Sequence, residues 1–266
     1  MKLRRVFTLV KLEMKRQMLD PLVLVFTTLL VPLLIFIFGF ALGKSYGWGE
    51  EYTVFEQMLP GFLAYGGLLT IYDVAAGVGG MHDSGIQQRI DTTPLTKAEY
   101  ILSQMISYTI KPIIQLILGI GLAIATGFRP AIFFNNPNLY GTYTAGQKIL
   151  GCLLIILIMV IFTFSSVGLG LITAAITKTG NAAAGLSFAF IVPQQIFGSF
   201  IPPYIFNLNF IGWIMPSWYA TYPILLIFIG VPFSAWEIWV RILALIAFSA
   251  IVYIIGIFLL DRKKKK

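Results

Sequence analysis

Long apolar stretches separated by short polar segments occupy most of the chain. A helix needs about 20 apolar residues to cross the hydrocarbon core of a bilayer, and stretches near this length are predicted spans. The six predicted spans are residues 22–43, 57–81, 100–127, 149–177, 181–201 and 237–260. The fifth is the least regular, because Asn181 and the Pro193-Gln194-Gln195 run interrupt it. Alternating segments of about ten residues, which build membrane β-barrels, are missing. The pattern therefore predicts an all-α membrane protein in which residues 1–266 form a single transmembrane domain.

Residues 1–20 follow a different pattern, in which apolar and basic positions separate on a helix. The apolar face carries Leu3, Val6, Phe7, Val10, Met14 and Met18. The remaining surface carries Arg4, Arg5, Lys11, Lys15 and Arg16. Such a basic amphipathic helix is typical of the headgroup region of a membrane, and Asp20-Pro21 predicts its end. A cleaved signal peptide is the alternative, but the basic region is too long and the next apolar run is of spanning length.

The segment before the last span, residues 202–236, is rich in aromatic residues and proline. Its aromatic residues are Tyr204, Phe206, Phe210, Trp213, Trp218, Tyr219, Tyr222, Phe228, Phe233 and Trp236. The default interpretation is an aromatic belt at the outer interface. A more specific hypothesis concerns residues 217–230, which are too short to cross the bilayer and are broken by proline. They are predicted to enter the membrane and return as a re-entrant element that caps the exit path.

Composition and charge place the chain in a bilayer and orient it. Hydrophobic residues make up 58% of the sequence and charged residues 11%, against about 25% charged residues in a soluble domain. Fourteen of the nineteen Lys and Arg fall on the side that holds both termini, four fall on the other side, and Lys111 lies within a span. Basic loops are typically cytosolic, so a multi-pass protein of the plasma membrane with both termini in the cytosol is predicted. The net charge of +8 then reflects topology and contact with anionic lipid, and nucleic-acid binding is not expected.

The polar stretch 82–99, HDSGIQQRIDTTPLTKAE, joins the second and third spans on the predicted cytosolic side. Ile86 and Ile90 lie four residues apart and would share a face of a short helix. The Thr93-Pro94 pair would end that helix. An amphipathic helix at the membrane surface needs something to cover its apolar face, and either lipid or a partner protein meets that need.

The order of these features resembles the ABC type-2 transporter permeases, the membrane subunits of ABC exporters. The resemblance covers essentially the whole chain: a basic interfacial helix, six spans, Pro60-Gly61 at the second span, Gly85 followed by Thr93-Pro94-Leu95 in the cytosolic segment, and the outer excursion before the last span. It departs from the family at Asp83, where members often carry Glu, and in the excursion after Pro202-Pro203, which lacks a basic residue before Gly230.

The resemblance implies a role for each part of the chain. Residues 83–97 would form a coupling helix that docks on a separate ATPase subunit. The residues matched to that role are Asp83, Gly85, Ile86, Arg89, Thr93, Pro94 and Leu95. The sequence has no G-x-x-x-x-G-K-[ST] run to hold phosphates, so ATP and Mg²⁺ would be bound by the partner, and this chain is expected to be a transport subunit rather than an enzyme. A second copy would complete the path as a homodimer. The expected cargo is a hydrophobic drug-like, lipid or lipid-linked saccharide molecule.

Two charged residues lie inside predicted spans, where ionisable groups are costly and functional. Asp73 precedes the end of its span by eight residues and Lys111 follows the start of its span by eleven. At about 1.5 Å per residue both lie roughly 12–17 Å above the cytosolic edge. Three interpretations stay open. The two residues pair between adjacent helices, they serve separate structural roles, or they contact the substrate. The same residues suggest the alternative function, an ion- or proton-coupled secondary transporter, although no internal repeat of broken helices is present.

Other residues have simpler interpretations. Gly39-x-x-x-Gly43 and the run 180–185 offer small faces for helix contact, either within one chain or between two. Glu237 and Arg241 form an ordinary helix pair. His82 has no neighbouring cluster that would make a metal site. A lipid-active enzyme is disfavoured, because no acid, base and nucleophile gather at one depth.

Overall fold

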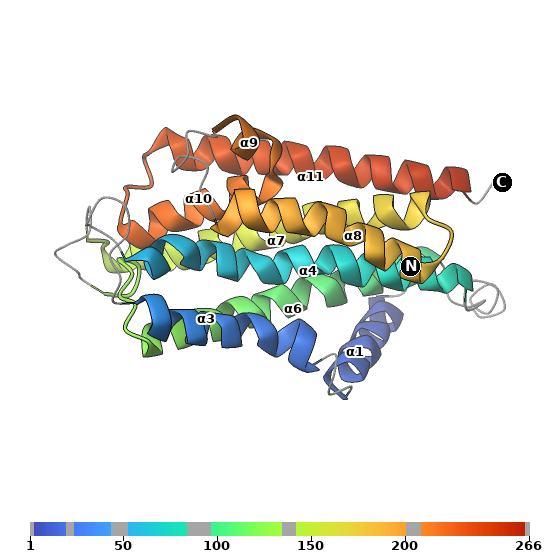
Figure 1. Cartoon of the computed structure of the whole chain (residues 1–266), viewed down its shortest axis with the longest axis horizontal. Helices are drawn as coiled ribbons and strands as arrows, with labels where there is room; N and C mark the ends of the chain where they lie inside the picture. Colours follow the sequence, from blue (N-terminus) through green and yellow to red (C-terminus); the bar gives the residue numbers. More distant parts are fainter. Residues whose placement is uncertain are drawn as a thin grey trace.

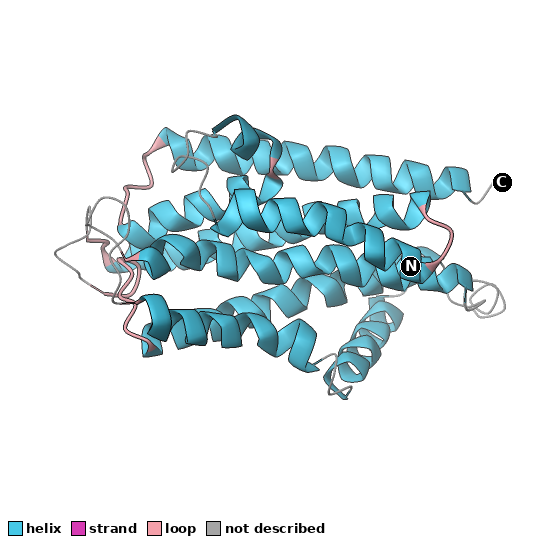
Figure 2. Cartoon of the chain, viewed as in Figure 1, coloured by secondary structure: helices cyan, strands magenta, loops and turns pink. Residues whose placement is uncertain are grey.

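The protein is described here by a computed structural model of residues 3–19, 24–43, 53–83, 97–134, 142–200 and 209–263. Every element in these residues is helical (Figures 1 and 2). The elements in chain order are α1 (Leu3–Leu19), the π-helix η1 (Leu24–Leu29), α3 (Leu30–Leu42), α4 (Val54–Asp83), α6 (Lys97–Ala125), α7 (Ala145–Ile176), α8 (Gly180–Gln195), the π-helix η2 (Ile196–Phe200), α9 (Asn209–Ile214), α10 (Pro216–Ile229) and α11 (Trp236–Lys263).

Four of the described helices are long and apolar enough to cross a bilayer. They are Val54–Gly80, Ser103–Ala125, Ala145–Ile176 and Trp236–Leu260, which agree with the second, third, fourth and sixth predicted spans. The first and fifth predicted spans do not form single α-helices of that length. The full set of six crossings therefore stays a prediction.

Proline and π-helical turns account for the two irregular spans. In the first, η1 passes directly into α3, which contains Pro32. Proline has no N–H, so it cannot donate to the carbonyl four residues earlier. That carbonyl belongs to Thr28, and it accepts instead from Gln115 Nε2 on α6 at 3.4 Å. In the fifth, Pro193 precedes the change from α8 to η2.

Side chains that cap the helices set boundaries that the apolar pattern misplaced. The second span begins at Val54, three residues before its predicted start at residue 57. The cause is a capping box, in which Thr53 N donates to Glu56 Oε2 at 2.8 Å and Glu56 N donates to Thr53 Oγ1 at 3.2 Å. At the start of α7, Gln147 Oε1 accepts from Thr144 N at 2.9 Å.

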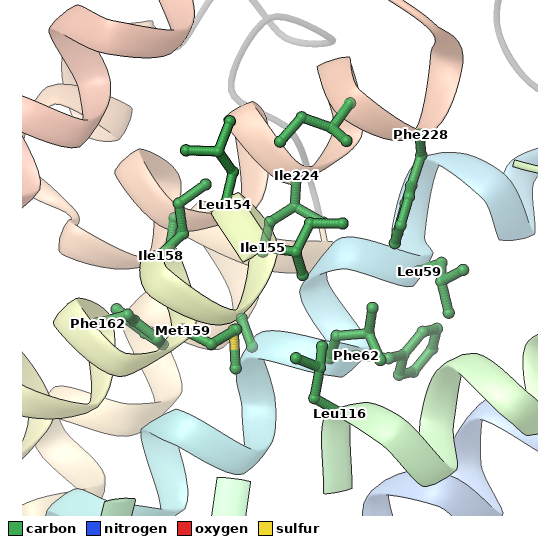
Figure 3. Close-up of a cluster of buried hydrophobic side chains, with 14 of the residues drawn as sticks. Leu59, Phe62, Leu116, Leu154, Ile155, Ile158, Met159, Phe162, Ile224 and Phe228 are labelled. Atoms are coloured by element: carbon green, nitrogen blue, oxygen red, sulfur yellow. The ribbon is translucent and has the colours of Figure 1, made fainter. Parts of the chain in front are cut away.

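Helix α4 lies in the middle of the bundle, with α3 and α6 on one side and α8 on the other (Figure 1). It also packs against α7 and α10. Large apolar side chains fill the space between these helices. Figure 3 shows residues of α7 and α10 pointing toward residues of α4 and α6, and the labelled members are Leu59, Phe62, Leu116, Leu154, Ile155, Ile158, Met159, Phe162, Ile224 and Phe228. Motion of α4 would therefore reach most of the molecule.

Different helix ends gather at the two ends of the bundle (Figure 1). The end of α4, the start of α6 and the C-terminal end of α11 lie together at one end of the molecule, where α1 also lies (Figure 1). Val6 and Val10 of α1 are buried, and α1 packs against α6, whereas Phe7 of the predicted apolar face remains exposed. Part of that face thus contacts protein.

Candidate functional site

The two charged residues predicted inside spans meet between α4 and α6. Lys111 Nζ donates to Asp73 Oδ2 at 2.6 Å, and the side chains of Lys111 and Asp73 are 7% and 15% exposed. A hydrogen bond between opposite charges is shorter and stronger than a neutral one. The pairing alternative is the one found in the structure, and it links the helix before the 82–99 stretch to the helix after it.

Lys111 belongs to a polar stripe that the sequence analysis missed. Buried polar residues follow one another at every fourth position of α6: Glu99, Ser103, Ser107, Lys111 and Gln115. Residues four apart lie on one face of a helix. Ser107 Oγ donates to Ser103 O at 2.9 Å along this stripe. The four-residue spacing was visible in the sequence, and it would have placed Lys111 on a polar face rather than alone in an apolar span.

An open aromatic face lies next to the ion pair. The rings of Tyr72 on α4 and Phe188 on α8 have centroids 5.7 Å apart. Both side chains are exposed, as is Val192 one helical turn beyond Phe188. Asp73 follows Tyr72 directly and is the more exposed member of the pair. The exposed apolar side chains of the α4–α8 face thus lie one residue along α4 from the ion pair, which joins α4 to α6.

The small-residue runs contact other helices of the same chain. A Cβ atom at Gly180 would lie 2.7 Å from Gly80 N, and one at Gly79 would lie 2.8 Å from Gly180 Cα. These distances mean that α4 and α8 touch backbone to backbone. Gly39 instead packs against the side chain of Thr126, whereas nothing lies within 4 Å of a Cβ at Gly185. Packing within the chain therefore accounts for Gly39 and Gly180, and Gly185 belongs to the open side of α8.

The outer excursion divides into buried and exposed aromatic residues. Helix α10 packs against α4, α7 and α11 and buries Trp218 and Phe228. Trp213 and Trp236 are exposed, in keeping with an aromatic belt. The predicted element at residues 217–230 corresponds to the helix α10 (Pro216–Ile229), but its depth in a membrane stays a prediction.

Two groups of contacts hold the segment before α7, the segment after α10 and the start of α11 in place. Tyr143 Oη donates to Val231 O at 2.6 Å, and its ring stacks on Phe233 with centroids 4.8 Å apart. Burial raises the pKa of Tyr143 to about 12, so the hydroxyl stays protonated and can donate. Arg241 lies 3.5 Å from Glu237 Oε2, as the spacing predicted, and its guanidinium covers the Tyr222 ring.

The predicted coupling residues lie largely outside the described residues. Gly85, Ile86, Arg89, Thr93, Pro94 and Leu95 belong to this group. Asp83 is the last residue of α4, and His82 precedes it in the same helix. Only the backbone of these two residues is described, and their side chains are not. Their role in coupling remains a prediction.

The described helices and the buried ion pair define an integral membrane protein with a charged element inside its bundle. The model of the ABC-2 family transporter proteins matches residues 44–258. The chain therefore belongs to this family and is a membrane permease of an ABC transporter. Comparison with curated protein sequences gives no significant match.

Proposed function

We propose that this chain is the permease subunit of an ABC exporter and that a separate ATPase subunit drives it through residues 82–99. The observation that carries the proposal is the position of the Asp73–Lys111 pair. It joins α4 and α6, the two helices that flank this stretch, and the family match includes the stretch. ATP and Mg²⁺ would be bound by the partner, and this chain would hydrolyse nothing.

The ion pair supports a mechanical role for α4 and α6. Asp73 lies ten residues before Asp83, and Lys111 lies fourteen residues after Lys97. At about 1.5 Å per residue, the pair is roughly 15–21 Å from the ends of the stretch. A displacement of the stretch would therefore move α4 and α6 as one body. Because α4 packs against α7, α8 and α10, the displacement would reach the rest of the bundle.

The open face of α4 and α8 supports a substrate path completed by a second copy. Tyr72, Phe188 and Val192 are exposed there. In a homodimer this face would line a central path for a hydrophobic drug-like, lipid or lipid-linked saccharide cargo. Helix α1, which carries Arg4 and Arg5, lies at one end of the bundle, and so does the connection between α7 and α8, which carries Lys178 (Figure 1). These basic segments support a cytosolic location for that end and for both termini in the plasma membrane.

The test is purification of the full chain from its native membranes in a mild detergent, followed by an ATPase assay. We expect vanadate-sensitive ATP hydrolysis to co-purify and to fall at least about tenfold when Arg89 and Leu95 are both replaced by Asp, a loss of about 1.4 kcal/mol or more in coupling. Matched substitution of the exposed Thr142 and Ser234 at the opposite end should leave the activity unchanged. ATPase activity that never accompanies the chain would overturn the proposal.

The ion pair itself favours one other function, proton-coupled secondary transport through Asp73 and Lys111. That function needs a proton gradient and no ATP. Transport that stops when a protonophore dissipates the gradient, and continues after ATP is removed, would select it.

A further inference from the structure

Polar side chains gather where the end of α8 meets the start of α10. Gln194 and Gln195 are the last two residues of α8 and are 4% and 7% exposed, and Ser217 and Thr221 of α10 are also buried. Gln195 lies fifteen residues beyond Gly180, or about 22 Å along a helix axis. That distance is shorter than the hydrocarbon core of about 30 Å. With Gly180 at the proposed cytosolic edge of the membrane, the junction would lie within the hydrocarbon core, where water is scarce.

The hydroxyl groups of α10 satisfy backbone carbonyls of this junction. Ser217 Oγ donates to Gln194 O at 3.0 Å, and Thr221 Oγ1 donates to Gly198 O at 2.9 Å. The two hydroxyls are four residues apart and share a face of α10. The change from α-helix to π-helix after Pro193 alters the helical hydrogen-bond pattern, and α10 supplies donors to the carbonyls there.

The backbone carbonyls of the junction accept hydrogen bonds, whereas most amide atoms of the two glutamine side chains have no partner in the described ranges. Gln194 Nε2 donates to Phe190 O at 3.1 Å. Gln194 Oε1, Gln195 Oε1 and Gln195 Nε2 are buried and have no hydrogen-bond partner within the described ranges. Buried polar groups are nearly always bonded, and an unbonded one carries its full desolvation cost. A residue that served packing alone at this depth would be more favourable as an apolar side chain. The unpaired amides therefore point to a ligand.

We propose that this junction binds an uncharged, hydroxyl-bearing group of the exported molecule, an inference that rests on the proposed export function and narrows its substrate class. The free donor and the two free acceptors match a hydroxyl, which both donates and accepts. The polar side chains that form the junction, Gln194, Gln195, Ser217 and Thr221, are all uncharged, so a charged group buried there would be left without a counter-ion. A glycerol-like or saccharide-like head on an apolar body fits this chemistry.

Helix α10 is the element that must move to admit such a group. Its contact with α8 and η2 includes the two hydroxyl–carbonyl hydrogen bonds, and it is close: a Cβ atom at Gly198 would overlap Ser217 Oγ. Separation of α10 from Gly198 would expose the glutamine amides. Because α10 also packs on α4, movement of α4 would be transmitted to this contact.

The experiment measures lipid retention by the full chain in nanodiscs with native mass spectrometry, without ATP or an ATPase subunit. The probes are monooleoylglycerol, which has two hydroxyls, and methyl oleate, which has a comparable acyl chain and none. We expect the wild type to retain monooleoylglycerol about tenfold better, the factor of one well-made hydrogen bond. The preference should fall below about twofold in the Gln194→Met/Gln195→Met variant. Ser165→Ala, which removes another unbonded buried polar atom, should keep it.

A stability readout separates this site from a structural role. Gln195→Met removes amide atoms that bond nothing in the described structure, so its unfolding temperature should equal or exceed that of the wild type. A lower unfolding temperature, equal retention of the two probes by the wild type, or an undiminished preference in the double variant would each overturn the proposal. Since no ATP is used, a missing ATPase partner would refute the export proposal without affecting this result.

Discussion

At the scale of single residues, the Asp73–Lys111 pair is the contact with the largest consequence. Removing one member of a buried ion pair leaves an uncompensated charge, which costs about 3–5 kcal/mol. Lys111→Met should therefore lower the stability of the chain by about 3 kcal/mol, the lower value because Asp73 is slightly exposed. Chemical unfolding of the purified chain in lipid–detergent micelles measures this loss.

The swapped variant Asp73→Lys/Lys111→Asp is the control. It keeps both charges and the contact, so it should recover most of the stability and activity lost in either single neutral variant. Unchanged stability in Lys111→Met, or no recovery in the swap, would show that the contact contributes little.

A second residue-scale prediction concerns Tyr143, whose hydroxyl ties the segment before α7 to the segment after α10. Tyr143→Phe removes the bond to Val231 O and should lower stability by about 1 kcal/mol. The pKa of about 12 in the folded protein exceeds the ordinary value of about 10. The unfolded chain therefore loses its proton first, and this contribution should be constant below about pH 10 and decline between about 10 and 12. Thermal unfolding at pH 7 and pH 9 should give the same difference, and a difference that shrinks between these values would contradict the assignment.

The contact between Asp73 and Lys111 could be predicted from the sequence, whereas the unpaired amide atoms of Gln194 and Gln195 could not. Counting residues from the span ends put Asp73 and Lys111 at one depth, and depth decides whether two charges can meet. Whether Gln195 is bonded depends on the π-helical turn after Pro193 and on the two hydroxyls of α10. No local pattern reveals either feature.

At the scale of elements, the close contact of α4 with α8 yields a matched pair of substitutions. Gly180→Ala places a methyl group 2.7 Å from Gly80 N, and forcing atoms into a packed contact costs about 1–3 kcal/mol. Gly185→Ala meets nothing within 4 Å and should gain up to about 1 kcal/mol from better helix propensity. Thermal unfolding should order the proteins as Gly185→Ala, wild type and Gly180→Ala, and equal values for the two variants would show that the contact is absent.

Element boundaries show what periodicity can and cannot predict. The length of the apolar runs correctly predicted the helices α4, α6, α7 and α11, because a helix that crosses lipid needs a long apolar run. The starts of α4 and α7 are set by hydrogen bonds of Thr53 and Thr144 with side chains three residues on. The T-x-x-E pattern at Thr53 was readable as a capping box, and it would have moved the predicted start of the second span from residue 57 to residue 54.

At the scale of the whole molecule, the proposed orientation places in the cytosol the end of the bundle that holds α1 and the C-terminal end of α11. In a chain whose single Cys152 is replaced by Ala, cysteines introduced at the exposed positions Thr142 and Ser234 should react with a membrane-impermeant maleimide added to intact cells. Cysteines at Lys178 and Arg262 should react only after permeabilisation, because basic segments remain cytosolic. The reverse labelling pattern would invert the topology and remove residues 82–99 from the cytosol.

The central claim is that a separate ATPase subunit grips the chain at residues 82–99. The most direct measurement is site-specific photo-crosslinking in native membranes, with the crosslinker at Ile86 and a control at Thr142 on the opposite end. The account predicts that a P-loop ATPase is captured from residue 86 and not from residue 142. Transport that proceeds in liposomes containing this chain alone, with no ATPase captured at residue 86, would contradict it.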